Sequence, residues 1–433
     1  MSDTRNRRIV VRSATVAVLI LILSILTIVP APSARAGEEV TIDGVLHIKN
    51  GSTPSGGLQT LELEEAWRIG GDDEDGMLLA LISEVCGDED GNVYVFDAQL
   101  CQVHVFSPTG ELLRTLFAQG EGPGETLRPR DLVITDKGVG VAEEFPAKVI
   151  MVDRNGLPIT NLIATVKGGG DGNMGALTSA GFGAGRFILA GTEIRMDNTR
   201  AVQDRIYFVS SFAETGEELV RFHESRSQYN FQKFEFSERD HVPPFWWAYD
   251  IDSEGNVYVS CDRDDYAVSV FSPDGKLIRV IEREFKPTKR SAPEKKRFYD
   301  MVEAALKGAP FEYTLEVEDY APVIDYFHRG VRLDGDGNLW VTSSEGLRDH
   351  TGGATMVYDV FDPAGHFARQ VAIDCGANMQ FDGLFWVSDD RVVLVTGAMS
   401  ALAAQFGQGA SLESEDEEGS PQEIVCYSVK IDA

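Results

Sequence analysis

Apolar and polar residues alternate along several short stretches of this chain. In residues 102–106, Val103 and Val105 alternate with Gln102 and His104, which is the pattern of a strand with one buried face. The 433 residues include 43 glycines against 17 prolines, so tight turns are expected between many such stretches. The pattern predicts an all-β protein built from short strands.

Two turn signatures recur along the chain. The first has the form Asp-x-x-Gly-Asn followed by an apolar strand, in residues 88–95, 252–259 and 334–341. The second has the form Phe-Ser-Pro-x-Gly or a close variant, in residues 103–114, 268–279 and 357–369. Glycine supplies the positive φ angle of such turns, and an Asp or Asn side chain closes them. Each pair of signatures therefore predicts one unit of four antiparallel strands.

The units repeat six times. Weaker copies occupy residues 135–156, 185–216 and 385–429, and repeated four-stranded units are typical of a β-propeller. The last unit has only three strands, and residues 61–69 are expected to supply its outer strand and close the ring. The predicted fold is a six-bladed β-propeller of four-stranded antiparallel blades with one short helical insertion.

These repeats carry a family resemblance. Together with Glu65-Ala-Trp-Arg-Ile-Gly-Gly71 and Gly120-Glu-Gly-Pro-Gly-Glu125, they resemble the bacterial six-bladed β-propeller proteins related to NHL repeats, over about residues 60–431. The resemblance implies an exported propeller. It does not imply one activity, because this architecture hosts lyases, binding modules and scaffolds.

The N-terminal residues 1–36 have the form of an export signal or a membrane anchor. Four arginines at positions 5, 7, 8 and 12 precede an apolar run from Ala14 to Val29, and Ala34-Arg-Ala36 has the form of a signal-peptidase site. The rest of the chain is expected to be exported, periplasmic or extracellular, and either released or tethered. We interpret residues 37–58 as a linker and residues 59–433 as the propeller.

The net charge argues against one class of partner, and the cysteine spacing argues against zinc sites and a disulfide framework. The formal net charge is −30 at pH 7, which repels phosphate backbones and argues against nucleic-acid binding. Membrane contact is expected only through the N-terminal segment. The five cysteines are widely spaced without a Cys-x-x-Cys pair, so they suggest no zinc site or disulfide framework, although Cys86 and Cys101 are close enough in sequence to form a bridge.

The long connections are predicted to lie on one face, and such a gathering often marks the binding face of a repeat protein. They comprise residues 117–130, 164–183, 222–246, 282–330 and 343–355. Ser291-Ala-Pro-Glu294 predicts the start of a helix that ends near Gly308 and forms either part of the rim or a lid. Segment 222–247 contains eight aromatic residues, which either pack on one another or line a pocket.

Candidate site residues follow from the same placement. The expected ligand-face residues, just past inner strands or in the long loops, are Asp97, Glu143, Asp262, His241, His328 and His350. The resemblance implies that a metal site is permitted, because some NHL-type lyases hold a zinc ion with histidines from several blades. The histidines here follow no ligand pattern, so no cofactor is expected, and zinc or calcium is an alternative. The Asp-x-Asp-x-Asn stretches lack the glycine of a calcium loop and are interpreted as hairpin turns. The acidic run 413–418 is interpreted as a solvated loop.

The sequence thus favours an exported ligand- or protein-binding module of the cell envelope. In this hypothesis the face with the long loops binds an unknown protein or small molecule. Two alternatives are a metal-dependent lyase or hydrolase of the NHL type and a structural envelope scaffold.

Overall fold

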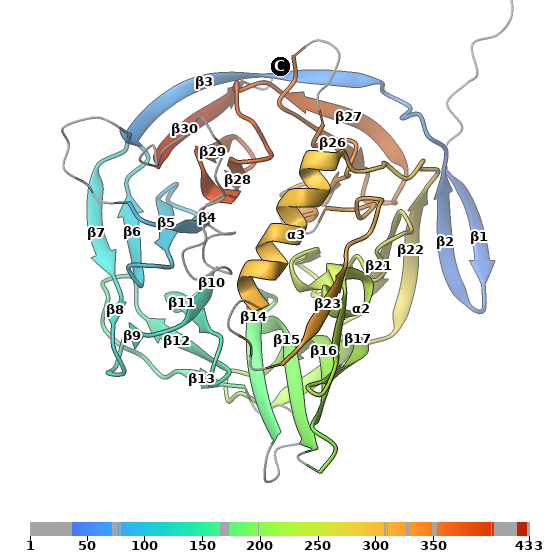
Figure 1. The fold of residues 1–433 in the computed structure, drawn as a ribbon. Helices are drawn as coiled ribbons and strands as arrows, with labels where there is room; N and C mark the ends of the chain where they lie inside the picture. The colour runs from blue at the N-terminus through green and yellow to red at the C-terminus, as the bar shows by residue number, and fades with distance from the viewer. Residues whose placement is uncertain are drawn as a thin grey trace, which may run out of the picture.

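The structure, a computed structural model, describes residues 37–71, 77, 79–164, 173–197, 199–306, 309, 311–325, 329–348, 353–399, 401 and 422–430. The predicted export segment 1–36, the acidic run 413–418 and the candidates His328 and His350 lie outside these residues. The regular secondary structure of the described chain is mostly β-strand, as predicted, and its sheets surround a common centre (Figure 1).

Three four-stranded antiparallel sheets follow one another in the described chain. The first contains β4 (Ile82–Gly87), β5 (Val93–Asp97), β6 (Gln102–Phe106) and β7 (Leu112–Leu116). The second contains β10 (Pro129–Ile134), β11 (Val139–Glu143), β12 (Lys148–Val152) and β13 (Leu162–Ile163). The third contains β14 (Asn173–Gly183), β15 (Arg186–Asp197), β16 (Val202–Phe212) and β17 (Glu218–Asn230).

The next sheet has six strands because the N-terminal hairpin joins it. Its strands are β19 (Tyr249–Ile251), β20 (Val257–Val259), β21 (Ala267–Phe271), β22 (Leu277–Arg283), β2 (Val45–Asn50) and β1 (Glu38–Ile42). β2 pairs in parallel with β22, and the buried Asn50 side chain donates to Glu282 O and Gly365 O, each at 2.9 Å. Part of the expected linker 37–58 is therefore a hairpin bound to this sheet.

The remaining eight-stranded sheet joins two strand groups through one long strand. Its strands, in order, are β24 (Val331–Leu333), β25 (Leu339–Thr342), β26 (Met356–Phe361), β27 (Phe367–Ile373), β3 (Leu58–Gly70), β30 (Glu423–Lys430), β29 (Arg391–Val395) and β28 (Gly383–Ser388). The first residues of β3 pair in parallel with β27, and residues 62–70 pair antiparallel with β30. An early strand thus borders the last three strands of the chain.

In the described part of the chain, short helices and pairs of short strands lie between the strands of these sheets. The helical elements include α2 (Glu238–His241), the 3-10 turn η1 (Pro244–Trp246) and α3 (Ala292–Leu306). The paired short strands are β18 (Phe234–Ser237) with β23 (Tyr313–Glu316), and β8 (Ala118–Gln119) with β9 (Glu125–Thr126). The predicted capping box of α3 is present, since Ser291 N donates to Glu294 Oε2 at 2.6 Å and Glu294 N donates to Ser291 Oγ at 3.4 Å. Figure 1 shows α3 lying across the centre of the molecule.

The Asp-x-x-Gly-Asn signatures are hairpin turns, as the sequence indicated. Asp88 Oδ1 accepts hydrogen bonds from the backbone N–H groups of Asp90 and Asn92, and its Oδ2 accepts from Asn92 Nδ2 and Tyr94 OH. Burial raises the pKa of Asp88, but these hydrogen bonds outweigh it and lower the pKa below its usual value. Both oxygens of the Asp88 carboxylate therefore accept hydrogen bonds from residues of its own hairpin.

Neighbouring sheets pack face to face through apolar side chains. In one cluster Val149 of β12 packs with Leu177 of β14 and Phe208 of β16. In another, Val268 of β21 packs with Val341 of β25.

All five cysteines are free, so the suggested bridge between Cys86 and Cys101 is absent. No helix in the described part of the chain has the length and hydrophobicity of a membrane span.

Candidate functional site

A cavity of about 740 Å³ occupies the centre of the molecule. Its wall includes residues of β4, β10, β14, β19, β24 and β28. Met301, Val302, Ala305 and Leu306 of α3 form another part of the wall. The cavity size is within the range of small-molecule sites.

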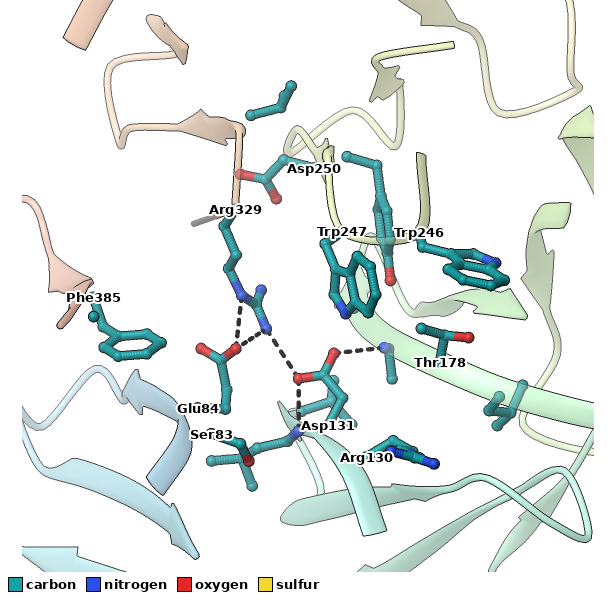
Figure 2. Close-up of a pocket in the computed structure, with 18 of the residues that line it drawn as sticks. Ser83, Glu84, Arg130, Asp131, Thr178, Trp246, Trp247, Asp250, Arg329 and Phe385 are labelled. Carbon is teal, nitrogen blue, oxygen red and sulfur yellow. Dashed lines mark hydrogen bonds and ion pairs between the residues drawn. The ribbon is translucent and has the colours of Figure 1, made fainter. Parts of the chain in front are cut away.

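Bulges shape the wall of the cavity on three consecutive inner strands. The pairing register shifts between Ile82 and Glu84, between Pro129 and Asp131, and between Leu177 and Ser179. The skipped residues Ser83, Arg130 and Thr178 all line the cavity (Figure 2). Bulges of this kind redirect side chains and are frequent beside functional sites.

An arginine bridges two carboxylates inside the cavity. Arg329 Nε donates to Glu84 Oε2 at 2.9 Å, and Arg329 Nη2 donates to Asp131 Oδ1 at 3.2 Å (Figure 2). The Arg329 side chain is 45% exposed, whereas those of Glu84 and Asp131 are only 9% and 5% exposed. The guanidinium therefore faces the cavity while the carboxylates that orient it lie in its wall.

The backbone at Arg329 is in the left-handed region, with φ at 45°. A non-glycine residue pays a steric cost there, and such strain is common where a side chain must be aimed at a site. Arg329 comes just before β24, so its backbone is held by the inner end of that sheet.

Burial dominates the acid–base properties of the cavity carboxyl groups. It raises the pKa of Glu84 to about 7, against the opposing charge of Arg329. It also raises the pKa of Asp131 and of Asp250. The Arg329 charge lowers all three pKa values in part, as expected for groups that share one cavity.

The same acids tie neighbouring sheets together. Asp131 Oδ2 accepts from the backbone N–H of Ala180 on β14 at 2.8 Å. Asp250 Oδ2 accepts from the backbone N–H of Leu333 on β24 at 2.7 Å. These bonds fix the carboxylate positions, so the polar part of the cavity is preorganised.

Aromatic side chains form one side of the cavity. Trp246 and Trp247 line it and meet edge to face, with ring centroids 5.6 Å apart. Trp246 Nε1 donates to Gly191 O at 3.3 Å, and Ser179 Oγ donates to Trp246 O. The aromatic segment 222–247 thus lines the cavity in part, and Phe234 and Phe236 also pack against α3.

Two sequence-predicted candidates, Asp97 and Glu143, are buried outside this cavity. Asp97 accepts hydrogen bonds from four backbone N–H groups, those of Ala80, Leu81, Gln99 and Leu100. Glu143 Oε2 accepts from Thr126 Oγ1 at 2.7 Å and from the backbone N–H of Leu127 at 3.2 Å. Both carboxylates hold their own loops in place.

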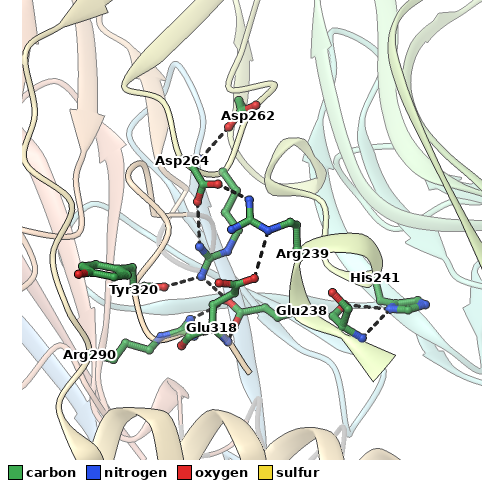
Figure 3. Close-up of polar contacts among 10 residues, drawn as sticks. Glu238, Arg239, His241, Asp262, Asp264, Arg290, Glu318 and Tyr320 are labelled. Carbon is green, nitrogen blue, oxygen red and sulfur yellow. Dashed lines mark hydrogen bonds and ion pairs between the residues drawn. The ribbon is translucent and has the colours of Figure 1, made fainter. Parts of the chain in front are cut away.

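Two further candidates lie near the polar cluster in Figure 3. Asp262 is exposed and accepts from the backbone N–H of Asp264 at 2.7 Å. His241 is buried beneath aromatic rings, and its Nδ1 lies 2.8 Å from Ser237 O. Burial lowers the pKa of His241, which favours the neutral imidazole. Neither residue is part of the cavity wall.

The cluster in Figure 3 is centred on Glu238 of α2, which is fully buried. Its carboxylate pairs with Arg263 at 2.8 Å and with Arg290 at 2.6 Å, and it accepts from the backbone N–H of Glu318 at 3.0 Å. These contacts join α2 to the two ends of the segment that carries α3. The cluster therefore anchors α3 over the cavity.

Within the described residues, no group of three or more His, Cys, Asp or Glu side chains is arranged to hold a metal ion. The predicted histidines His328 and His350 are outside those residues, and zinc or calcium stays an untested alternative.

Sequence reasoning missed the charged residues that face the cavity, Glu84, Asp131 and Arg329, whereas Trp247 belongs to the aromatic segment 222–247 that was expected either to pack on itself or to line a pocket. One signal was available for two of them. Glu84 lies four residues before Asp88, the first residue of its turn, and Asp131 lies four residues before Thr135, the equivalent position in the next unit. Arg329 has no counterpart in the repeat and carried no such signal.

Comparison with known proteins supports the fold. The family model DUF5128, described as a 6-bladed beta-propeller, matches residues 73–158. The resemblance to bacterial β-propeller proteins that the repeats carry is thereby confirmed. No curated protein sequence matches the chain.

Several solved structures are similar at low identity. A Bacteroides fragilis protein described as exported has 11% identity, covers 89% of this chain and 100% of its own, and gives a TM-score of 0.47. A Bacteroides vulgatus member of the duf4221 family has 10% identity, coverages of 86% and 98%, and a TM-score of 0.42. Virginiamycin B lyase from Staphylococcus aureus has 9% identity, coverages of 84% and 99%, and a TM-score of 0.38. At TM-scores this low, the similarities carry no argument about activity.

Proposed function

We propose that this chain is an exported binding module that holds a small-molecule ligand in its central cavity. One observation carries the proposal: a guanidinium oriented by two buried carboxylates is exposed inside a cavity of about 740 Å³. A purely structural propeller needs no such arrangement. Preformed cavities with a few oriented polar groups are the usual form of ligand sites.

The fold part of the proposal is a closed ring of six four-stranded blades. Three sheets are single blades, β19–β22 form a fourth, and the eight-stranded sheet divides into β24–β27 and β28–β30 with β3. In this arrangement β3 is the outer strand of the last blade, so the first and last segments of the ring are hydrogen-bonded together. Closure of this kind removes exposed sheet edges.

Two of the five long segments predicted for the binding face support this choice of site. Segment 222–246 contributes Tyr229 and Trp246 to the cavity wall, and segment 282–330 contributes Met301 and Ala305. The face with the long connections and the cavity are therefore parts of one candidate site. The remaining hypotheses, a metal-dependent lyase or hydrolase and an envelope scaffold, have no specific observation in their favour.

Export rests on residues 1–36 and is tested with a reporter. A C-terminal reporter that is active only outside the cytoplasm should be active when fused to the full chain, and a cytoplasmic signal would contradict export. Mapping of the mature N-terminus then separates cleavage before Gly37 from an uncleaved anchor.

Binding is tested by blocking the cavity. A small-molecule library is screened against residues 37–433 by thermal shift and by quenching of tryptophan fluorescence. The blocking variant is Ala305→Trp, which fills the cavity from α3, and its control is Glu303→Trp on an exposed position of the same helix outside the cavity wall. We expect compounds that bind saturably, and we expect their thermal shift and fluorescence quenching to be lost in Ala305→Trp and kept in Glu303→Trp. Ligands that bind both variants alike would overturn the cavity as the site, and so would a screen without any saturable ligand.

A further inference from the structure

Four arginines of the described chain line the cavity, and three of them pair with carboxylates. The fourth, Arg205 of β16, has no ion pair among the described residues. Acidic residues outnumber basic ones 69 to 39 in this chain, so an arginine in a cavity wall without a carboxylate leaves positive charge available to a ligand. The paired arginines are Arg329 with Glu84 and Asp131, Arg130 with Glu144, and Arg332 with Asp389.

Arg205 is held in one orientation by two uncharged groups. Its Nε donates to Gln203 Oε1 at 2.6 Å, and its guanidinium carbon lies 3.7 Å from the centre of the Tyr229 ring. Asp204, its neighbour in the chain, lies on the other face of β16 and accepts from Gln228 Nε2 at 2.7 Å. Stacking on a ring leaves the N–H edge of a guanidinium open, so Nη1 and Nη2 of Arg205 form a pair of available donors.

An apolar wall begins beside Arg205. Tyr229, on which the guanidinium lies, stacks on Phe234 with ring centroids 4.5 Å apart. Both rings pack in one cluster with Met301 and Leu306 of α3, and all four side chains line the cavity. A molecule that reaches Arg205 from inside the cavity therefore lies against apolar side chains, which favour an apolar ligand body.

The acidic groups near Arg329 direct an anionic group toward Arg205. Besides the two carboxylates bonded to Arg329, Asp250 lies close enough for the Arg329 charge to lower its pKa in part (Figure 2). Arg332, the other cation that acts on Asp250, is paired with Asp389 at 2.6 Å. A ligand anion at Arg329 would thus meet a local excess of carboxyl groups. Each oxygen of Asp250 already accepts a backbone N–H, so this side chain ties two sheets together.

We propose, on the basis of the cavity site proposed above, that its ligand is an amphipathic carboxylic acid. Nη1 and Nη2 of Arg205 donate to the two carboxylate oxygens, in the parallel arrangement that a guanidinium forms with a carboxylate. The apolar body of the ligand packs against Met301 and Ala305 of α3. A single negative charge suits this cavity, because its other acidic groups disfavour a more highly charged ligand.

The first test varies the charge of the ligand and keeps its apolar body constant. Protein purified from cells that express the full chain is titrated by calorimetry with alkyl and arylalkyl carboxylic acids. The primary amides and amines with the same apolar groups are titrated in parallel. We expect at least one acid to bind saturably, about tenfold or more tightly than its amide and its amine. Ala305→Trp should abolish this binding, and Glu303→Trp should not.

The second test identifies the cation. Arg205→Gln should weaken binding of the acid about tenfold or more and leave the affinity for the amide nearly unchanged. Arg226→Gln, at an exposed position of the neighbouring strand β17 outside the cavity wall, changes the net charge equally and should leave both affinities unchanged. In the unchanged chain the bound acid should protect Arg205, and not Arg226, from modification by phenylglyoxal. This measurement does not depend on the folding of a variant.

The outcomes separate the ligand class from the cavity site. If amides or amines bind as tightly as the acids and Ala305→Trp blocks them, the carboxylic acid proposal is wrong and the cavity site stands. If the acids bind Arg205→Gln as tightly as the unchanged chain and do not protect Arg205, the acid group binds elsewhere and the proposal is equally wrong. If no acid binds saturably, the proposal is wrong, and the library screen decides the cavity site independently.

Discussion

Gly110 lies directly against the indole ring of Trp67. A Cβ atom built on Gly110 would be 2.7 Å from Trp67 Cγ, which is closer than carbon atoms approach without displacement. Gly110 belongs to the second turn signature of the first sheet, and Trp67 belongs to β3. The equivalent Gly275 and Gly365 are equally close to Val220 and Ile281, at 2.6 Å and 2.9 Å. The turn glycine thus serves as a packing surface for a strand of a neighbouring sheet.

This relationship predicts an unequal cost for glycine substitutions. Gly110→Ala should combine a left-handed conformation, at φ of 86°, with a clash, and lower the free energy of unfolding by about 3 kcal/mol. Gly185→Ala has a similar φ of 72° but nothing within 4 Å, so it should cost only about 1 kcal/mol. Urea unfolding of both variants checks the difference. Equal losses would show that the contact with Trp67 adds nothing.

The N-terminal hairpin should contribute to stability through Asn50. Its side chain donates to two backbone carbonyl groups and accepts from the N–H of Phe367 at 2.9 Å. Asn50→Ala would leave buried groups unpaired and should lower the free energy of unfolding by about 2–4 kcal/mol. Lys49→Ala, at an exposed neighbouring position, should change it by less than about 0.5 kcal/mol. A melting temperature unaltered by Asn50→Ala would restore the linker interpretation of residues 37–58.

Stability should depend on pH through Glu84. Burial raises its pKa from 4.5 to about 7, so the folded state binds a proton more tightly than the unfolded state does. The contribution of Glu84 to stability therefore falls as pH rises from about 4.5 to about 7, by roughly 3 kcal/mol at most. Glu84→Gln removes this loss, so the stability of the variant relative to the unchanged chain should increase over that window. Parallel curves of unfolding free energy against pH would contradict the assignment.

The position of α3 should depend on Glu238. Glu238→Gln leaves Arg263 and Arg290 without their buried carboxylate, which should cost about 3–5 kcal/mol. Hydrogen exchange should accelerate in residues 288–306 and 311–325, because the cluster binds backbone groups of Glu318 and Tyr320, with a smaller change in β4–β7. Glu235→Gln, which removes an exposed ion pair with Lys233, is the control and should leave exchange unchanged. Uniform acceleration throughout the chain would mean that the cluster supports the whole fold and not α3 in particular.

Local features of this protein could be predicted from its sequence because their hydrogen bonds close within a few residues. The turn at Asp88 is held by atoms of Asp90, Asn92 and Tyr94, and the start of α3 is held by Ser291 and Glu294. The repeat of such turns was therefore sufficient to predict an all-β chain.

The same local view assigned Asp97 and Glu143 to a ligand face, because both follow strands. It could not show that the Asp97 carboxylate accepts hydrogen bonds from the backbone N–H groups of Ala80 and Leu81. These residues lie 17 and 16 positions away in the chain and come close to Asp97 only when the sheet forms. It likewise interpreted residues 37–58 as a linker, because no local pattern indicates that β2 pairs with β22.

The central cavity was decided by the tertiary structure alone. Glu84 and Arg329 are 245 positions apart in the chain, and no periodicity relates an arginine outside the repeat to a carboxylate on another sheet. Their contact exists because the inner strands surround one centre, and burial there shifts the pKa of Glu84 far from its ordinary value. The sequence by itself thus determined the strands and turns, whose energies are local. The cavity depends on the arrangement of the sheets. This arrangement brings side chains that are far apart in the sequence, and that belong to no motif, into one space of low dielectric constant.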